Sequence, residues 1–284
     1  MINMHPSTYY ADLTRHYLLY AGYNGFHYGI WENDVHDHAE SLIRSNEVML
    51  RRIAVNRSTR VLDIGCGVGA FAVWCTMKYG CHVTGITIVP EHIEMAREHA
   101  RIKGVGHMCE FLLMDMNALD FPVGSFDLAL NQETFCYAEN KVDVLRRIRK
   151  ILTPGGVWTA MEFARSDHNQ TIEEYHLYAD VLEGFHISHF LSSEDTLTVM
   201  RESSFEDIAV TDLTPLTDRS SRHIIRHCYA PLMLERLHID WIFFSRNPVC
   251  RRNHQGHFRA AYAFSRGLLD RVFKYNAYFG RRPH

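Results

Sequence analysis

The sequence lacks the features that mark membrane-spanning, secreted and disulfide-bonded proteins. No stretch of it comes near the run of about 18 apolar residues that a membrane-spanning helix needs. Its N-terminal segment has no basic start followed by an apolar core, so we expect no signal peptide. The seven cysteines are an odd number and form no CxxC pair, which indicates reduced thiols in a cytoplasmic protein.

Metal-binding signals are also scarce, although the sequence contains 19 histidines. No HxxxH motif comes with an evident third ligand, so we predict no metal site of the protein's own. Repeats and low-complexity linkers are absent from the 284 residues, of which 46% are hydrophobic and 22% charged. This composition predicts a globular protein with a sizeable core and excludes a mainly disordered chain.

The charge is distributed unevenly along the chain. Residues 1–213 carry a net charge of −12, whereas residues 214–284 carry a net charge of +9. Twelve of the 13 cations in this second part are arginines. An arginine-rich end suits an anionic partner such as a phosphate, a nucleic acid or an acidic lipid surface; alternatively, it packs as an ordinary cap on the acidic body.

Alternating strand and helix patterns predict an α/β fold. Through residues 60–163, helical segments separate the apolar runs RVLDI, HVTGITI, EFLLMD, SFDLALNQET and GVWTAMEF. This rhythm predicts a Rossmann-like, doubly wound, mainly parallel sheet. The expected parts are a helical N-terminal cap at 1–55, a core at 56–165, a helical insertion at 166–204 that forms part of the substrate pocket, and a basic region at 205–284.

The basic C-terminal region is expected to begin with a strand, SFEDIAVTDLTP. We predict two helices after it, at residues 218–245 and 257–279, joined by the loop RNPVCRRNHQG. The N-terminal cap and the insertion are expected to cover the mouth of the sheet.

A glycine-rich turn, LDIGCGVGAF, gives the strongest local signal. Gly65, Gly67 and Gly69 form GxGxG between a predicted strand and a predicted helix, where glycines let backbone amides approach a ligand closely. Dinucleotide-binding proteins use GxGxxG at this place. Here the third glycine of that fingerprint is missing and Asp63 precedes the turn by two positions, which argues against NAD.

Together with Asp115–Met116 after the third strand and LTPGG after the fourth, the turn resembles the class I S-adenosylmethionine (SAM) methyltransferases. The run GITIVPEH further resembles GITLSPEQ of the cyclopropane fatty acid synthases, with His92 where the glutamine stands. The resemblance implies SAM as the cofactor. With Asn131 added from its place at the end of the fourth strand, the cofactor-binding residues implied are Asp63, Gly65, Cys66, Gly67, Gly69, Thr87, Ile88, His92, Asp115, Met116 and Asn131.

The fourth predicted strand ends in NQETFCY. Ligands of open α/β sheets bind at the carboxyl ends of the strands, so Glu133 is expected beside the SAM sulfonium. Burying a carboxylate there costs free energy, which indicates that it has a function. With HYGIW at 27–31 and DLTP at 212–215, this run resembles the terpenoid C-methyltransferases that act on geranyl, farnesyl or isopentenyl diphosphate. The resemblance implies that Glu133 and Tyr28 are catalytic.

The implied reaction methylates an alkene carbon through a carbocation, with cyclisation where the cation attacks a second double bond. We expect Glu133 to remove the final proton and aromatic faces to stabilise the cation. Arginines three and four residues apart would share a helix face and bind a diphosphate that Mg²⁺ bridges. The substrate-binding candidates are Phe26, His27, Trp31, Tyr175, Tyr178, Phe185, Arg219, Arg222 and Arg226.

Three other interpretations stay open. The first is a SAM methyltransferase of a neutral natural product such as a prenylated alkaloid, which a pocket without clustered arginines beside Glu133 would favour. The second, an RNA methyltransferase, lacks a DPPY motif after the fourth strand and interleaved basic and aromatic residues in the tail, so we expect no nucleic-acid partner. The third is a SAM-binding regulator without activity. An isoprenoid-directed enzyme of secondary metabolism, able to form a homo-oligomer, is our prediction.

Overall fold

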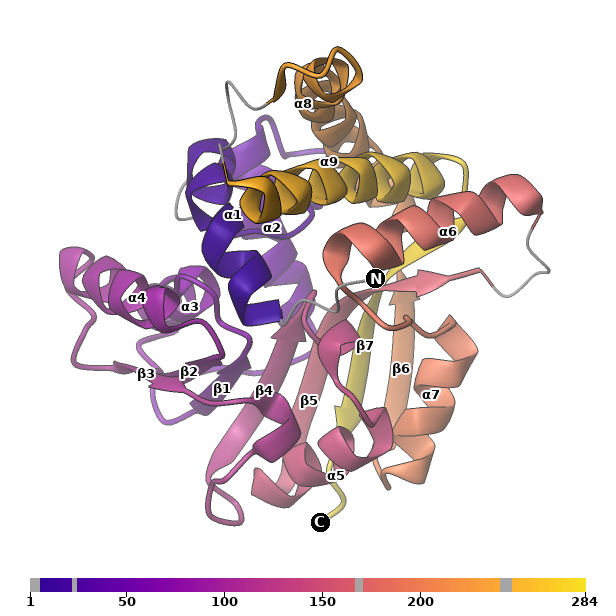
Figure 1. The fold of residues 1–284 in the computed structure, drawn as a ribbon. Helices are drawn as coiled ribbons and strands as arrows, with labels where there is room; N and C mark the ends of the chain where they lie inside the picture. The colour runs from indigo at the N-terminus through magenta and orange to yellow at the C-terminus, as the bar shows by residue number, and fades with distance from the viewer. Residues whose placement is uncertain (1–5, 22–24, 167–170, 241–246) are drawn as a thin grey trace.

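The chain folds, in a computed structural model, into one seven-stranded sheet with helices on both faces (Figure 1). The structure describes residues 6–21, 25–166, 171–240 and 247–284. The strands are β1 (Arg60–Ile64), β2 (His82–Thr87), β3 (Cys109–Leu113), β4 (Phe126–Gln132), β5 (Leu152–Arg165), β6 (Glu206–Asp212) and β7 (Phe273–Arg281). Their order is β3-β2-β1-β4-β5-β7-β6, and only the pairs that β7 forms with β5 and β6 are antiparallel. The predicted doubly wound, mainly parallel sheet is confirmed.

Helices form the layers on either side of the sheet and above its carboxyl edge. They are α1 (Pro6–Ala21), α2 (His38–Leu50), α3 (Ala70–Tyr79), α4 (Pro90–Ile102), α5 (Lys141–Ile151), α6 (Ile172–Phe185), α7 (Ser193–Glu202), α8 (Asp218–Arg236) and α9 (Pro248–Leu269). One buried cluster joins the sheet to α2, α3 and α4, and a second joins the opposite face to α5 and α7. Along β5, Val157 and Met161 enter the first cluster while Trp158 and Ala160 enter the second, as expected for a strand covered on both faces.

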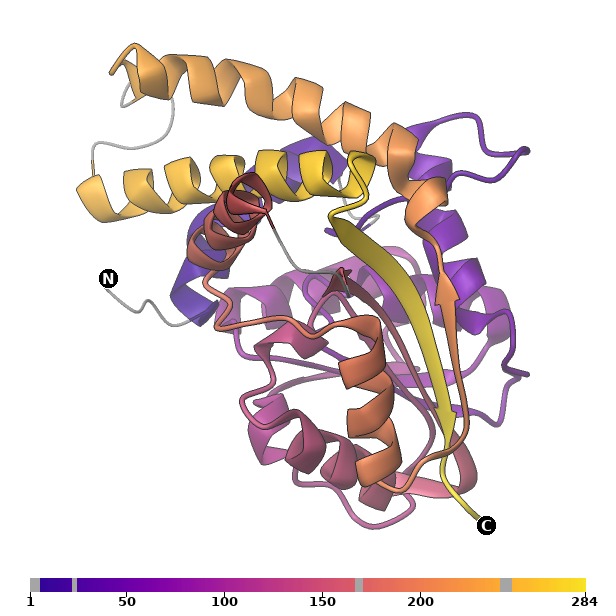
Figure 2. The same cartoon turned by 90° about the vertical axis from the view of Figure 1, so that its right-hand side faces the viewer.

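A separate helical layer covers the carboxyl edge of the parallel strands. Figure 1 shows α1, α6 and α9 above that edge, and Figure 2 shows α8 outside α9, so that α8 is the outermost helix. Helix α9 packs against α1, α6 and α8. Among the described residues, no helix is both long and apolar enough to cross a bilayer.

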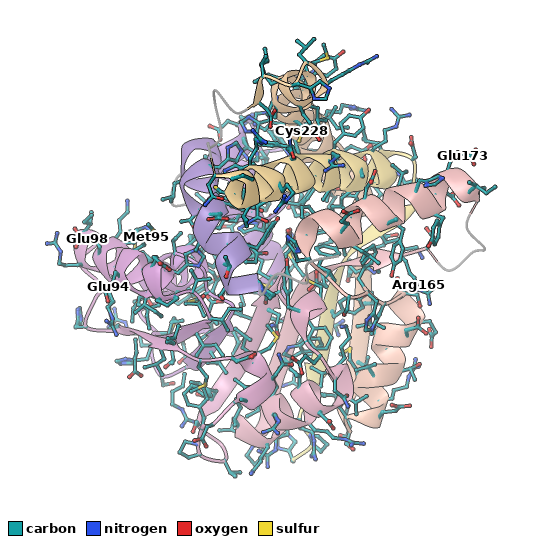
Figure 3. The ribbon with its side chains drawn as sticks, in the orientation of Figure 1. Glu94, Met95, Glu98, Arg165, Glu173 and Cys228 are labelled. Carbon is teal, nitrogen blue, oxygen red and sulfur yellow. The ribbon has the colours of Figure 1, made fainter. Side chains whose placement is uncertain are left out.

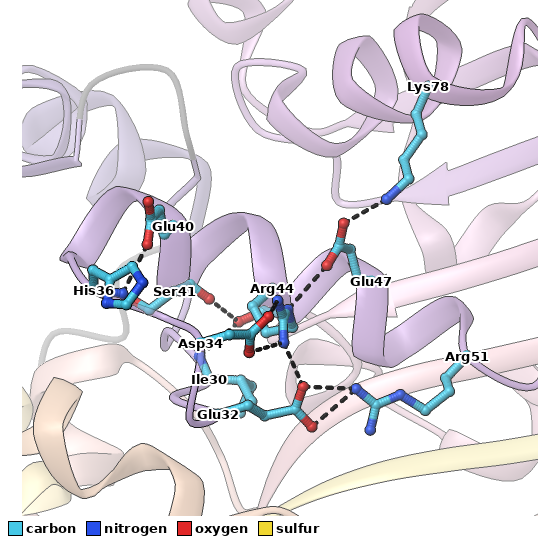
Figure 4. A network of polar contacts seen from close by, with 11 residues as sticks. Ile30, Glu32, Asp34, His36, Glu40, Ser41, Arg44, Glu47, Arg51 and Lys78 are labelled. Atoms are coloured by element: carbon cyan, nitrogen blue, oxygen red, sulfur yellow. Dashed lines mark hydrogen bonds and ion pairs between the residues drawn. The ribbon is translucent and has the colours of Figure 1, made fainter.

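Ion pairs anchor the segment between α1 and α2 to the body of the protein (Figure 4). Arg44 of α2 pairs with Glu32 at 2.6 Å and with Asp34 at 2.7 Å, and Glu47 joins Arg44 to Lys78 of α3. Exposed pairs contribute only about 0–1 kcal/mol each. The network therefore fixes the course of the segment more than it stabilises the fold.

The prediction for the C-terminal region is wrong in three places. The helix predicted at 218–245 ends at Arg236, and residues 237–238 form a turn. Residues 248–256, predicted as loop, open α9, because Asn247 caps the helix through its side chain and Pro248 occupies its first turn. The predicted helix at 257–279 ends at Leu269, and Phe273–Arg281 is β7. Arg271 adopts φ 62° where a glycine usually ends a helix, so the sequence carries no glycine stop signal. Residues 22–24 of the predicted aromatic run and residues 241–246 lie outside the described residues.

Candidate active site

The carboxyl ends of β1, β2 and β4 surround a cavity of about 1180 Å³. Pockets for single small ligands usually measure roughly 300–1,000 Å³. Helix α1 contributes Tyr10 and Tyr17 to its wall, and α6 and α9 complete the side away from the sheet. The cavity therefore has room for more than one small molecule.

The glycine turn forms one wall of this cavity. Its first two positions require glycine for different physical reasons. Gly65 has φ 80°, and a Cβ there would lie 2.5 Å from Cγ2 of Thr134, so glycine is required by the packing of the turn itself. Gly67 has φ 50°, and the nearest atom to a Cβ there would be Cδ2 of Phe26 at 4.0 Å. The space in front of Gly67 is thus open to a ligand.

Most of the predicted cofactor residues line the cavity together. They are Asp63, Gly65, Cys66, Gly67, Thr87, Ile88, His92, Asp115 and Met116. Gly69 instead caps α3, with Ala96 and Phe111 close behind it. Asn131 is fully buried, donates to Thr134 Oγ1 at 3.0 Å and accepts from Trp158 Nε1 at 3.0 Å, so it supports the turn from behind.

Two buried polar atoms in the cavity wall lack a protein partner. Asp63 Oδ2 and His92 Nδ1 have no hydrogen bond within the described structure. Burial raises the pKa of Asp63 to about 7 and lowers the pKa of His92 to about 4, so His92 is neutral. Asp115 uses only Oδ1 in its recorded hydrogen bonds, both to Asn117.

These atoms decide what kind of ligand fits. Thr14 donates its hydroxyl proton to the carbonyl of Tyr10 at 2.6 Å, so His92 Nε2 donates to Thr14 Oγ1 at 2.7 Å and Nδ1 remains an acceptor. Buried acceptors without donors are costly. The amine and hydroxyl groups of SAM are donors of the kind these acceptors lack, and the residues present therefore fit that cofactor.

Glu133 lies at the end of β4, at the border between this wall and the rest of the cavity. Its backbone has φ 54°, unusual for a residue with a side chain, and is held by a hydrogen bond to the carbonyl of Met161 at 2.8 Å. Oε1 accepts from the backbone N–H of Tyr28 at 2.7 Å and from the hydroxyl of Tyr275 at 2.7 Å. Burial raises the pKa of Glu133 to about 7, against the opposing effect of these two donors.

The free oxygen of Glu133 gives it a chemical role. No donor to Oε2 is recorded among the described residues, and Glu133 lines the main cavity. A carboxylate anchored through one oxygen, with a pKa of about 7, can take a proton at neutral pH. This is the arrangement of a general base.

A smaller cavity of about 80 Å³ extends the site beyond Glu133. The two cavities share Glu133 and the aromatic side chains of Tyr17, Phe26, Phe163 and Phe185. The smaller one is lined mainly by rings and aliphatic groups, among them Tyr28 and Phe264. The carboxylate is therefore bordered by an aromatic compartment.

Tyr28 reaches Glu133 through its backbone rather than its phenol. Its hydroxyl lies 2.6 Å from Oγ of Ser265, and its ring packs edge-on against Phe264. The phenol therefore faces α9, and the hydroxyl that contacts Glu133 is that of Tyr275 on β7.

The predicted substrate residues divide into two groups. Phe26, His27 and Phe185 line both cavities. Neither cavity is lined by Trp31, Tyr175, Tyr178, Arg219, Arg222 or Arg226 in the part of the chain that the structure describes.

The positions of these outlying residues have physical causes. Tyr175 is 61% exposed in the first turn of α6, whereas the cavity meets only the later turns of that helix. Tyr178 packs on Phe190 at 4.8 Å between ring centroids. Trp31 donates to Ser220 and lies under the guanidinium of Arg219 at 3.9 Å, and the remaining two arginines are exposed on α8.

Sequence reasoning also missed several lining residues. The α9 side chains of Arg252, Asn253 and Arg259 lie at the cavity, on a segment that was predicted partly as loop. Tyr10 and Tyr137 line it too, with their hydroxyls 3.2 Å apart. The Asn-Pro pair at 247–248 was the signal that could have placed the α9 residues on a helix.

No cluster of three or more His, Cys, Asp or Glu side chains suited to a metal ion occurs within the described ranges. A cation such as Mg²⁺ would therefore depend mainly on phosphate oxygens of a ligand.

Comparison with known proteins agrees with this geometry. The family profile described as "Methyltransferase domain" matches residues 62–160. The chain is 26% identical over 184 residues to methyltransferase phqN of Penicillium fellutanum, covering 64% of this chain and 56% of that protein. It is 27% identical over 219 residues to sterol 24-C-methyltransferase ERG6A of Gibberella zeae, covering 74% of this chain and 57% of that protein. The chain thus spans little more than half the length of these curated relatives.

A solved structure extends the likeness over nearly the whole chain. The geranyl diphosphate C-methyltransferase of Streptomyces coelicolor A3(2), in complex with Mg²⁺, geranyl diphosphate and S-adenosyl-L-homocysteine, matches with a TM-score of 0.69 at 17% identity. The match covers 96% of this chain and 98% of that one, and at this identity it shows the fold alone. Residues 62–160 therefore match the methyltransferase domain family, and the chain has the fold of the class I SAM-dependent methyltransferases.

Proposed function

We propose that the protein is a SAM-dependent C-methyltransferase that methylates an alkene carbon of an isoprenoid diphosphate through a carbocation. The single observation that carries the proposal is Glu133, a carboxylate anchored at Oε1, free at Oε2 and bordered by aromatic side chains. A reaction that passes through a carbocation needs both the rings and a base.

When bound, SAM supplies an electrophilic methyl group. Asp63 and His92 hold the cofactor through the atoms that lack a protein partner, Asp115 contributes its second carboxylate oxygen, and Gly67 leaves the cofactor room. These residues orient the cofactor against the end of β4, where Glu133 lies.

The aromatic compartment accounts for the rest of the reaction. Tyr17, Phe26, Phe163 and Phe185 exclude water from the alkene and present their faces to positive charge. Addition of the methyl group leaves a cation on the neighbouring alkene carbon. Oε2 of Glu133 then takes a proton from an adjacent carbon, and the electron pair of that C–H bond restores a double bond.

The diphosphate contacts are assigned to α9 rather than to α8. Arg252 and Arg259 line the main cavity, whereas the α8 arginines do not. Arg252 has no recorded ion pair within the described residues, and Arg259 lies 3.7 Å from Glu235 with half of its side chain exposed. Both guanidinium groups are therefore accessible to phosphate oxygens.

Methyl transfer from labelled SAM to geranyl, farnesyl and isopentenyl diphosphates tests the proposal, with mass spectrometry of the extracts. We expect a methylated diphosphate from at least one of them. Arg252→Ala should raise KM for that substrate about tenfold or more and leave SAM affinity unchanged. The matched control is Arg101→Ala on α4, which does not line the cavity and should leave KM unchanged. No transfer to any prenyl compound would refute the proposal.

A neutral prenylated substrate is the second candidate, favoured by one observation. The main cavity is lined by two arginines and by the carboxyl groups of Asp63, Asp115, Glu133, Glu139 and Glu183, so acidic side chains outnumber basic ones there. Equal turnover of a prenyl alcohol and its diphosphate, with Arg252→Ala without effect on KM, would select this candidate.

A further inference from the structure

The arginine stripe of α8 belongs to neither cavity, and it lies on an unusual surface. Arg222, Arg226, Tyr229, Met233 and Arg236 follow one another at spacings of three and four residues and so share one face of the helix. This face is solvent-exposed: Tyr229 is 65% exposed and Met233 41%. Figure 2 shows α8 as the outermost helix of the layer.

The other side of α8 is fixed to the protein. Cys228 is buried against Phe258 and Ala261 of α9, and Figure 3 labels Cys228 between the two helices. The helix therefore cannot turn its exposed face inward without losing this contact.

Apolar side chains continue from this face to the turn between α8 and α9. Leu237 is 59% exposed, Ile239 38% and Val249 42%. Val249 lines the main cavity together with Arg252 and Arg259 of α9, so it is not counted with the α8 side chains. We define the α8 surface as Arg222, Arg226, Tyr229, Met233, Arg236, Leu237 and Ile239.

The charge of the α8 surface is of one sign. Its arginines have no recorded hydrogen bond or ion pair within the described residues. The two carboxylates of α8 are engaged elsewhere, because Asp218 pairs with Arg271 at 2.8 Å and Glu235 lies 3.7 Å from Arg259. Exposed apolar side chains interleaved with unpaired arginines are typical of a helix that lies in a lipid–water interface.

We infer that the α8 surface docks the protein on an anionic lipid bilayer. The arginines would contact lipid phosphates while Tyr229, Met233 and Leu237 enter the boundary with the acyl chains.

Two other occupants fit the surface less well. In a symmetric dimer through this face, Arg222, Arg226 and Arg236 would meet the same arginines of a second copy, and like charges repel. A nucleic acid would pair with the arginines but leave the apolar side chains in water. A bilayer with anionic lipids satisfies both kinds of side chain.

Sedimentation with vesicles tests the inference without any methyl transfer, so its outcome is independent of the proposed function. The protein should sediment with vesicles of phosphatidylcholine and phosphatidylglycerol in equal parts and much less with phosphatidylcholine alone. The variant R222Q/R226Q/R236Q should bind the mixed vesicles on the order of 100-fold more weakly. This corresponds to a loss of affinity of about tenfold or less for each arginine replaced. Y229S/M233S should weaken binding with its salt dependence retained.

The matched control R101Q/R146Q/R201Q removes the same number of charges from exposed positions outside the α8 surface. It should bind the mixed vesicles as the wild type does. Equal loss in the two triple variants would mean that only net charge matters and would overturn the inference. Absence of vesicle binding would overturn it too, as would a dimer in light scattering that Y229S/M233S abolishes.

Discussion

Tyr275→Phe separates the hydrogen bond that tunes Glu133 from the packing around it. The change removes the phenol that donates to Oε1 at 2.7 Å and keeps the ring that packs beside Tyr28. A hydrogen bond to a charged group contributes roughly 1.5–3 kcal/mol, and one pKa unit corresponds to about 1.4 kcal/mol. Loss of this donor should therefore raise the pKa of Glu133 by about 1–2 units above its value of about 7.

The pH dependence of turnover measures this shift. At pH 7 the ionised fraction of Glu133 falls from about one half to roughly 1–10%, so the rate should fall roughly 5- to 50-fold and recover near pH 9. SAM affinity by calorimetry should not change, because Tyr275 does not line the main cavity. Tyr278→Phe is the matched control on the same strand, because the hydroxyl of Tyr278 contacts Asn276 at 2.9 Å and not Glu133. If turnover falls off at the same acidic pH in Tyr275→Phe and in the wild type, Glu133 is not the titrating base.

Three further changes probe the cofactor wall and the base. Glu133→Gln should lower turnover by about 10²–10⁴-fold with calorimetric SAM binding intact; a rate near that of the wild type would contradict the assignment. Gly67→Ala should weaken SAM binding at least about tenfold, at a stability cost of about 1–2 kcal/mol for a side chain in the left-handed region, as thermal unfolding would report. Asp63→Asn should stabilise the ligand-free protein at pH 8 by up to about 4 kcal/mol in urea unfolding. The pKa of Asp63 is raised to about 7 in the fold, so its ionisation destabilises the fold increasingly as the pH rises from about 4 to about 7, and the cost is constant above that range. The difference between the variant and the wild type should therefore vanish below about pH 4.

Local signals made the glycine-turn wall of the cavity predictable. The turn at Gly65 and Gly67 depends on backbone geometry that only a few residue types adopt. Asp115 follows the end of a strand directly, so its position at the sheet edge follows from the strand itself. The position of each of these residues is set by its neighbours in the sequence, so a sequence pattern can predict it.

Contacts between distant segments could not be predicted in the same way. Tyr275 lies on β7, a strand buried on both faces without clear alternation and preceded by Arg271 in place of a terminating glycine. Its hydrogen bond to Glu133 depends on the insertion of β7 between β5 and β6. The α8 arginines have helical spacing as predicted, but spacing does not say which side of a helix meets a cavity.

The base is held by parts of the chain outside the methyltransferase domain itself. Residues 62–160 supply Glu133 and the cofactor wall, whereas both donors to Oε1 come from the flanks, Tyr28 before the domain and Tyr275 after it. The aromatic compartment likewise takes Phe26 and Phe264 from the flanking segments. In the proposed reaction, the flanking segments therefore set the ionisation of Glu133 and shape the space beside it.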